Sequence, residues 1–535
     1  MSGIIPTPTM VGLATGSYAL PRTVRVAVDE RLVAAPLDDA MARINELTEH
    51  QATAVWGGNE SAEILIRLVD ADPILDGLRS THGLSPADRD PADERYVIEV
   101  TESGIEVRAT AAEGLARGIA SLTQLIVGGA AGEVSIQCQC IVDAPRFAWR
   151  GLSVDVVRTF FPPTAVKAVI DMLALYKMNV LHLHLTDNQG WRLEIPSLPQ
   201  LTGLGAVGAV GNRPGGFYSP AEFQDIINYA AERFVTVVPE IDVPGHAGAI
   251  LKSYPELRSP DQASHDYDPS AGYLDPRMES TREFLSQVFT HLAKVIPGPY
   301  LHIGGDEAFG MPETLYQEFI ALVLPLVRAT GKKVIGWQEI ARGDLSSSDI
   351  IQYWVNGGID VREALNNLPA EFAMGPEMIE AMVIQFKNAG LDLQKAQEQG
   401  AHVLLSPTTV AYFDTPHAET SISREQELRR PGLGFRAYPP KSTADSIAWD
   451  PETVIPEADM SGVIGIEAAV WCETVESEAD LHMLLLPRLA GFAEKGWSPQ
   501  DSLIWDEYSQ RLAAQAPLWR QAGWHFFESS LVEWS

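Results

Sequence analysis

Cysteine, positive charge and long apolar runs are all scarce in this 535-residue chain. The three cysteines, Cys138, Cys140 and Cys472, are too few for a disulfide framework. Cys138 and Cys140 would supply only half of the four ligands of a structural zinc site. We therefore expect buried or idle thiols and no structural metal.

The shortage of positive charge is large, since 39 Lys and Arg residues face 71 Asp and Glu residues, for a net charge of −32. Nucleic acids and anionic membrane surfaces would repel such a chain, so neither is an expected partner. The apolar runs, such as residues 483–486, fall far short of the roughly 20 residues of a membrane span.

Residues 1–20 lack the basic segment and apolar core of a secretory signal. The sequence thus favours a cytoplasmic protein and says nothing of its oligomeric state.

What is present is an ordinary globular composition, 46% hydrophobic and 21% charged. A chain of this length is too long to fold around one hydrophobic core, which predicts two or three domains. Residues 1–143 read as a small α+β domain. Its expected elements are a strand at 62–68, a hairpin of strands 96–100 and 105–109, and a helix at 113–126.

Residues 144–503 alternate short β-rich runs with longer helical stretches, which is typical of an α/β protein built as a (β/α)₈ barrel. The eight candidate strands are 151–155, 180–185, 235–241, 300–303, 333–337, 350–354, 403–405 and 463–471. A doubly wound open sheet is the alternative, but no glycine-rich phosphate loop follows the first strand. Residues 356–400 predict a helical excursion, and residues 504–535 a helical tail packed on the barrel.

Polar and aromatic side chains gather around the predicted strand ends, where barrels place their function. Carboxylates suit sugar hydroxyls and aromatic faces suit pyranose rings, so this composition indicates a sugar site. The candidates are Arg150, Asp155, His182, His184, Asp187, Asn188, Gln189, Trp191, Glu240, Asp242, His246, His302, Asp306, Glu307, Trp337, Glu339, Trp354, Tyr412, Asp414, Trp471 and Glu473.

The sharpest element is Gly304-Gly305-Asp306-Glu307, which follows the fourth strand candidate. The glycines permit unusual dihedral angles, so that two adjacent carboxylates turn into one cavity. Because close carboxylates repel, one of them is pushed to hold a proton near neutral pH. A glycosidase acid needs such a proton to release its leaving oxygen.

At this point the chain resembles the family 20 glycoside hydrolases, the β-N-acetylhexosaminidases, over nearly its whole length. The first domain, with RYVIEV followed by GLARGIASLTQLI, is similar to the α+β domain that commonly precedes this barrel. The matching barrel segments are FAWRGLSVDV (147–156), KMNVLHLHLTDNQGWRLEI (177–195), GGFYSPAEF (215–223), VVPEIDVPGHA (237–247), HIGGDE (302–307), GWQEI (336–340), AYFD (411–414), GIEAAVWCET (465–474) and PRLAGFAEKGWS (487–498).

The resemblance implies an exo-β-N-acetylhexosaminidase that retains configuration without a metal or cofactor, the substrate's own acetamido group acting as the nucleophile. Glu307 is then the proton donor, and Asp306 accepts a hydrogen bond from the acetamido N–H. Tyr412 holds the acetamido oxygen. Asp187 and His246 stand behind Glu307 and tune its protonation.

The resemblance also implies two binding groups for the terminal amino sugar. The acetamido pocket and the sugar ring are lined by Trp337, Trp354 and Trp471. The outer hydroxyls are bound by Arg150, Asp414 and Glu473. Because Asp414 and Glu473 suit either epimer at O4, the sequence does not choose between N-acetylglucosamine and N-acetylgalactosamine. A role for Glu339 as a helix cap, and for Arg150 as an ion-pair partner of Asp155, stays open.

A metal-dependent amidohydrolase is one rival interpretation. His182 and His184 alternate on one strand, and His246, His302 and Asp306 would complete a ligand set. That class, however, places its paired histidines on the first strand and an aspartate on the last, and neither is found here.

Two further rivals keep the sugar site. A lacto-N-biosidase-like enzyme, which releases a disaccharide, needs only a deeper pocket. A non-catalytic amino-sugar-binding protein would keep the tryptophans but would have no use for Asp306, Glu307 and Tyr412 together.

Overall fold

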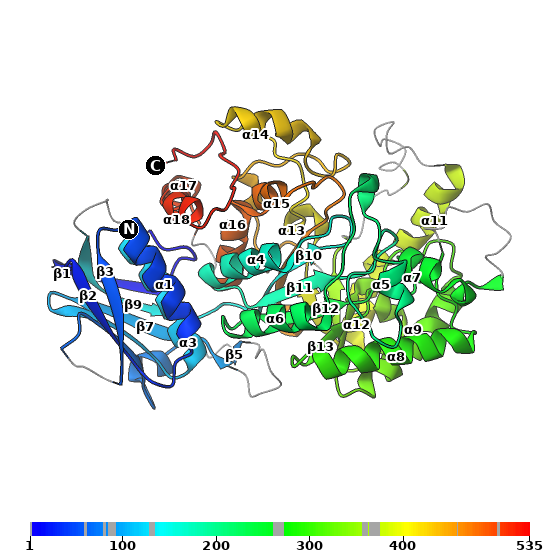
Figure 1. Cartoon of the computed structure of the whole chain (residues 1–535), viewed down its shortest axis with the longest axis horizontal. Helices are drawn as coiled ribbons and strands as arrows, with labels where there is room; N and C mark the ends of the chain where they lie inside the picture. The colour runs from blue at the N-terminus through cyan, green and yellow to red at the C-terminus, as the bar shows by residue number, and fades with distance from the viewer. Residues whose placement is uncertain are drawn as a thin grey trace.

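The computed structural model describes residues 3–57, 61–78, 82–83, 92–127, 134–260, 272–355, 362, 375–456, 458–499 and 503–534 (Figure 1). Its amino-terminal part is a mixed seven-stranded sheet in the order β1-β9-β7-β8-β4-β2-β3. The strands are β1 (Met10–Ala19), β2 (Thr23–Val28), β3 (Gln51–Trp56), β4 (Ile64–Leu68), β7 (Tyr96–Thr101), β8 (Gly104–Ala109) and β9 (Ser135–Asp143). A two-stranded ribbon, β5 (His82–Gly83) with β6 (Ala92–Asp93), and a short helix, α2 (Pro73–Asp76), lie beside it.

Two helices of this part, α1 (Ala34–Leu47) and α3 (Ala112–Val127), contact each other. The sheet and these helices share one apolar core, to which α3 contributes Leu115, Ile119, Leu122 and Ile126 at helical spacing. The expected hairpin and helix of the first domain are present as β7, β8 and α3.

Eight parallel strands then close into a barrel, because β17 pairs with β10 as well as with β16. This pairing excludes the open-sheet alternative. The strands are β10 (Trp149–Asp155), β11 (Val180–His184), β12 (Thr236–Glu240), β13 (Tyr300–His302), β14 (Lys333–Trp337), β15 (Ile350–Tyr353), β16 (His402–Leu405) and β17 (Val463–Val470).

Nearly every residue of these strands is buried, as expected for parallel strands covered on both faces. Each lies within two residues of a run expected from the sequence.

Helices surround the barrel (Figure 1), and local sequence sets where several of them begin. In α6, Ser219 and Glu222 form a reciprocal capping box and Pro220 occupies the first turn. The helices are α4 (Pro163–Leu175), α5 (Gln200–Gly203), α6 (Pro220–Ala231), α7 (Gly248–Ser253), α8 (Glu279–Val295), α9 (Glu313–Arg328), α11 (Pro376–Lys387), α12 (Ala389–Glu398), α13 (Thr408–Ala411), α14 (Arg424–Arg429), α15 (Glu478–Leu485), α16 (Arg488–Trp497), α17 (Trp505–Ala513) and α18 (Ala516–Gln521).

The expected excursion at 356–400 is helical in α11 and α12, while 356–361 and 363–374 lie outside the described residues. Helix α18 contacts α1, and the two lie close together in Figure 1. Arg511 on α17 also donates to the carbonyl of Ile4. The tail therefore touches the first domain as well as the barrel. Among the described helices, none combines the length and apolarity that crossing a membrane requires.

Buried charges join the first domain to the amino-terminal end of the barrel. Glu94 Oε1 accepts from Arg117 Nε at 2.8 Å and from Arg150 Nη2 at 2.6 Å, and all three side chains are buried. Lys177 Nζ lies 2.8 Å from Asp143 Oδ2, and both are fully buried. Since an unpaired buried charge is costly, these pairs fix how the two parts meet.

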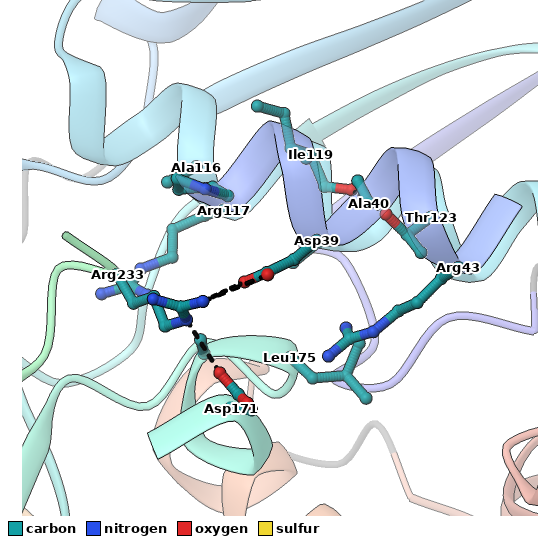
Figure 2. Close-up of a pocket in the computed structure, with 13 residues that line it drawn as sticks. Asp39, Ala40, Arg43, Ala116, Arg117, Ile119, Thr123, Asp171, Leu175 and Arg233 are labelled. Carbon is teal, nitrogen blue, oxygen red and sulfur yellow. Dashed lines mark hydrogen bonds and ion pairs between the residues drawn. The ribbon is translucent and has the colours of Figure 1, made fainter. Parts of the chain in front are cut away.

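A small hollow marks the same junction (Figure 2). Arg233 follows α6 and reaches between Asp39 of α1, at 2.9 Å, and Asp171 of α4, at 2.8 Å. The residues that line the hollow come mainly from α1, α3 and α4, and none comes from the carboxyl ends of the barrel strands. The hollow therefore belongs to the joint between the two parts.

Candidate active site

The loop after β13 turns sharply at Gly304 and Gly305, whose φ angles are 66° and 104°. A Cβ at residue 304 would overlap Asp242 Oδ1, so only glycine fits there. Asp242 Oδ1 also accepts the main-chain N–H of Gly305 at 3.1 Å. Glu307 and His246 adopt positive φ angles of 45° and 47°, strained conformations that occur preferentially at functional sites.

This loop brings two carboxylates and an imidazole together. His246 Nε2 lies 3.6 Å from Asp306 Oδ2 and 3.6 Å from Glu307 Oε2. The Glu307 side chain is 23% exposed, whereas that of Asp306 is 11% exposed. Asp306 Oδ1 is buried without a hydrogen-bond partner among the described residues, so it can accept one from a ligand.

Asp187 holds His246 from behind. Its Oδ1 lies 3.1 Å from His246 Nδ1, and its Oδ2 lies 2.9 Å from His184 Nε2 and 2.7 Å from Arg158 Nη2. Burial alone would lower the pKa of His246, but the carboxylates of Asp187, Asp242 and Asp306 outweigh burial and hold it well above its ordinary value. The His246 ring therefore favours its protonated, positively charged form beside Glu307.

Two buried glutamates continue this network into the barrel. Glu240 lies 2.5 Å from His184 Nδ1 and 3.0 Å from His302 Nδ1. Glu467 lies 2.8 Å from His182 Nδ1, and His182 Nε2 lies 3.2 Å from Glu240. His182, Glu240 and His302 lie close enough to share a metal ion. In this structure, however, His182 is hydrogen-bonded to Glu467 and His184 to Glu240, while His302 Nδ1 accepts the main-chain N–H of Gly304 at 3.0 Å.

Buried His182 gives the protein a pH-dependent stability. Burial alone would lower its pKa, but Glu240 and Glu467 outweigh burial and raise the pKa from 6.5 to about 9. A raised pKa in the folded state stabilises the protein below pH 6.5 and loses that contribution as pH rises through about 9. We expect the free energy of unfolding to fall by about 3 kcal/mol across this window through His182.

Urea unfolding at several pH values between about 6 and 9 measures this loss. The variant His182→Gln removes that part of the slope, whereas His402→Gln, at an exposed position of β16, keeps it. An unchanged slope in His182→Gln would contradict the assignment.

Four aromatic rings form a continuous wall at the carboxyl ends of β14, β15, β16 and β17. Ring centroids lie 6.3 Å apart for Trp337 and Trp354, 6.0 Å for Trp337 and Trp471, and 6.0 Å for Tyr412 and Trp471. Trp337 Nε1 donates to Glu240 Oε1 at 2.9 Å, which ties this wall to the buried network. Burial raises the pKa of Tyr412 well above its usual range, so its hydroxyl remains a donor.

Glu339 has a different position from the helix cap that the sequence left open. It is 2% exposed, lies inside the 3₁₀ helix η4 (Gln338–Arg342), and accepts from Trp354 Nε1 at 3.2 Å. Burial, together with the Asp306 charge, raises the pKa of Glu339 to about 8. Burial and Asp306 also raise the pKa of Asp242 well above its usual range. Both groups near Asp306 therefore hold their protons to a higher pH than ordinary carboxyl groups do.

Asp414, Glu473 and Arg158 form the polar end of the site. Asp414 is 2% exposed, and its Oδ1 has no hydrogen-bond partner within the described ranges. Burial and the Glu473 charge raise the pKa of Asp414 well above its usual range. Arg158 Nε lies 3.9 Å from Glu473 Oε1, and its guanidinium lies 5.3 Å from the centre of the Trp471 ring.

The prediction that Arg150 binds substrate is corrected by its position. Arg150 is the second residue of β10, at the amino-terminal end of the barrel, and its guanidinium pairs with Glu94. The open ion-pair alternative also named the wrong arginine, because Arg158 lies 3.5 Å from Asp155. Arg158 was missed, although its place three residues after β10, at the carboxyl end, was the available signal.

The other predicted site residues meet at one mouth, that of the carboxyl ends of the strands. They are Asp187, His246, Asp306, Glu307, Trp337, Trp354, Tyr412, Asp414, Trp471 and Glu473. Adjacent carboxylates, a tuned imidazole and a wall of aromatic rings at a barrel mouth define a glycoside hydrolase.

Comparison with protein families places the chain more narrowly. Residues 147–313 and 310–500 match the model described as glycosyl hydrolase family 20, catalytic domain, and residues 1–144 match domain 2 of that family. The chain belongs to glycosyl hydrolase family 20.

Known relatives agree with this assignment. A β-N-acetylhexosaminidase of Cellulomonas fimi is 38% identical over 468 residues, which cover 85% of this chain and 86% of the relative. The N-acetyl-β-hexosaminidase of Streptomyces plicatus, solved with Thio-NAglucal, superposes with a TM-score of 0.80 at 32% identity and covers 100% of this chain and 98% of that one. The β-N-acetylhexosaminidase of Streptomyces coelicolor A3(2) gives 0.81 at 31% identity, covering 100% and 99%.

Proposed function

We infer that the chain is an exo-β-N-acetylhexosaminidase, which removes a terminal non-reducing β-linked N-acetylhexosamine with retention of configuration. The observation that carries this inference is the geometry at Asp306 and Glu307. The partly exposed Glu307 can reach a leaving oxygen, while buried Asp306 presents an unpartnered oxygen to the pocket beside it. One carboxyl group that donates a proton and a second that accepts a hydrogen bond suit a substrate whose own acetamido group is the nucleophile.

In the first step, the carbonyl oxygen of the 2-acetamido group forms a bond to C1 as the glycosidic C1–O bond breaks. Glu307 transfers its proton to the departing oxygen. Asp306 accepts the acetamido N–H and stabilises the positive charge of the resulting oxazolinium ion. Tyr412 donates to the acetamido oxygen and fixes its line of approach. Because nucleophile and C1 belong to one molecule, the step gains the advantage of proximity.

In the second step, a water molecule attacks C1 and the oxazolinium ring opens to the acetamido group. The Glu307 carboxylate takes the proton of that water and returns to its starting state. Two inversions at C1 give net retention. His246, held by Asp187 and with a raised pKa, lies beside Glu307 and stabilises its carboxylate form between the two steps.

The remaining residues bind the sugar. Trp337, Trp354 and Trp471 enclose the acetamido methyl group and stack on the ring. Arg158, Asp414 and Glu473 bind the outer hydroxyls. A further sugar unit attached to those hydroxyls would clash with these three residues. Attack at a terminal residue follows.

The direct test compares p-nitrophenyl N-acetyl-β-glucosaminide with the plain p-nitrophenyl β-glucoside. We expect rapid cleavage of the first and, because the second has no acetamido nucleophile, a kcat/KM lower by at least about 10³-fold. Release of p-nitrophenol measures both. The N-acetyl-β-galactosaminide in the same series reports the preference at C4. Cleavage of neither monosaccharide substrate by folded protein would instead favour disaccharide release or sugar binding alone.

A further inference from the structure

Arg213 lies on the segment between α5 and α6, directly after the 3₁₀ helix η1 (Val210–Asn212). It is outside the set of residues that the mechanism uses. Its guanidinium donates to four main-chain carbonyls on two other loops: those of Val475 at 2.8 Å, Glu473 at 2.9 Å, Arg158 at 3.1 Å and Cys472 at 3.4 Å.

The two loops that Arg213 joins carry sugar-binding side chains on opposite sides of the barrel closure. Arg158 follows β10, and Glu473 follows β17. These loops also touch through Thr159, whose hydroxyl donates to the carbonyl of Val475 at 2.5 Å and lies 3.2 Å from that of Cys472. The N–H of Cys472 donates to Asp155 at 3.0 Å. Arg213 is the contact that reaches the backbone of both Arg158 and Glu473 from a third segment.

The acceptors of Arg213 set it apart from neighbouring arginines. Arg429 and Arg430 form ion pairs with Asp480 and Glu427, whereas the partners of Arg213 within the described ranges are main-chain carbonyls only. The role of Arg213 therefore depends on the planar guanidinium, whose several N–H donors point in fixed directions, and not on neutralising a carboxylate. A lysine cannot reproduce that geometry.

The side-chain positions explain why this contact concerns binding. Arg158 Nε and Glu473 Oε1 are 3.9 Å apart, which is beyond a direct hydrogen bond. Because this contact is weak, the two side chains do not fix each other. Arg158 is anchored to Asp187 at 2.7 Å, and the distance from Arg158 to Glu473 then depends on how their backbones are held. A hydroxyl that binds to both groups therefore depends on how the two loops are held.

We propose that Arg213 is a positioning residue, which clamps the Arg158 and Glu473 loops at the separation required to bind the 4-hydroxyl of the terminal sugar. The proposal rests on the proposed function of the site. It adds a determinant of substrate recognition that contacts no substrate itself. Glu307 and Asp306 lie on the loop after β13, outside the two clamped loops, so the main effect of the clamp is on binding. A smaller effect on kcat is expected as well, because Arg158 also contacts Asp187, which holds His246.

The kinetic test uses Arg213→Gln and Arg213→Lys, with Arg282→Gln on an exposed part of α8 as the matched control. In Arg213→Gln we expect KM for p-nitrophenyl N-acetyl-β-glucosaminide to rise about tenfold and kcat to change less than about threefold, as for the loss of one charged hydrogen bond. Arg213→Lys resembles Arg213→Gln. Arg282→Gln resembles the unsubstituted protein.

A 4-deoxy substrate distinguishes a binding role from a merely structural one. If the clamp positions the groups that bind the 4-hydroxyl, removing that hydroxyl costs the unsubstituted protein more than it costs Arg213→Gln. We expect the 4-deoxy penalty in kcat/KM to shrink at least about threefold in the variant. Equal penalties in the two proteins, or full rescue by Arg213→Lys, would overturn the proposal.

Hydrogen–deuterium exchange tests the clamp independently of catalysis. Arg213→Gln is expected to speed exchange in the loops at residues 157–160 and 472–476 and to leave the loop at 304–307 unchanged. Unchanged exchange at both clamped loops would also refute the clamp. Inactivity of the unsubstituted protein, combined with the expected exchange, would refute the proposed function while leaving the clamp intact.

Discussion

Replacement of Glu307 by Gln is expected to lower kcat for p-nitrophenyl N-acetyl-β-glucosaminide by about 10²- to 10⁴-fold, because the amide has no proton to transfer. The shape of the side chain is retained, so KM should change little. A 2,4-dinitrophenyl leaving group departs without protonation, and its glycoside should suffer a much smaller loss in the first step. Steady-state and burst kinetics on the two substrates measure the difference.

The matched control for this variant is Glu318→Gln, at an exposed position of α9. It makes the same chemical change outside the barrel mouth and should leave both substrates unaffected. An equal loss of first-step rate on the two leaving groups would show that Glu307 acts other than by protonating the leaving oxygen.

Replacement of Asp306 by Asn should cost about 10²- to 10³-fold in kcat on the N-acetylated substrate, by analogy with the removal of one preorganised charge-stabilising group. The asparagine keeps an acceptor for the acetamido N–H but loses the charge that stabilises the oxazolinium ion. Because the oxazolinium charge develops only along the reaction, KM should rise much less than kcat falls.

Asp306→Asn should also change its two carboxyl neighbours. The Asp306 charge contributes to the raised pKa values of Glu339, which is about 8, and of Asp242. Without that charge both pKa values fall, which NMR titration of the two carboxyl groups can follow. A variant with near-normal kcat, or with the pKa of Glu339 unchanged, would be inconsistent with the charged role of Asp306. The control Asp344→Asn changes an exposed carboxylate near β15 and should have neither effect.

The order and extent of the barrel strands could be read from the sequence because parallel strands are buried on both faces. Short apolar runs such as 333–337, which coincide with β14, are therefore conspicuous. The carboxyl ends of the strands also carried most of the site. Asp306 and Glu307 could be predicted from their local sequence, because the two glycines before them allow the turn that points both carboxyl groups into the site.

Arg150 shows the limit of that method. Polar residues occur at both ends of a buried strand. The alternation of side-chain direction along the strand does not show which end of the barrel binds the substrate. Counting from the last strand residue would have favoured Arg158, which lies beyond the carboxyl end, over Arg150 near the start. The resemblance to a family supplied the right kind of residue, an arginine, at the wrong end of β10.

Apart from Asp187 and His246, which the resemblance placed behind Glu307, the contacts between distant residues could not be predicted from the sequence. Trp337 donates to Glu240, which is 97 positions away, and Trp354 donates to Glu339 across two loops. Their pairing depends on the closed barrel, as do the raised pKa values that accompany it. A helix-cap role for Glu339 stayed open beside its place among the site candidates, because cap chemistry is local. In the folded barrel its buried carboxyl group accepts from Trp354 instead.

The charge pairs at the base of the barrel bear on how the two parts of this chain can be exchanged. Arg150 and Lys177 belong to the barrel, whereas their partners Glu94 and Asp143 belong to the first domain. A chimera that joins this barrel to a relative's first domain would strand two buried cations unless the incoming domain brought matching acids. A functional hybrid must therefore carry over both sides of these ion pairs.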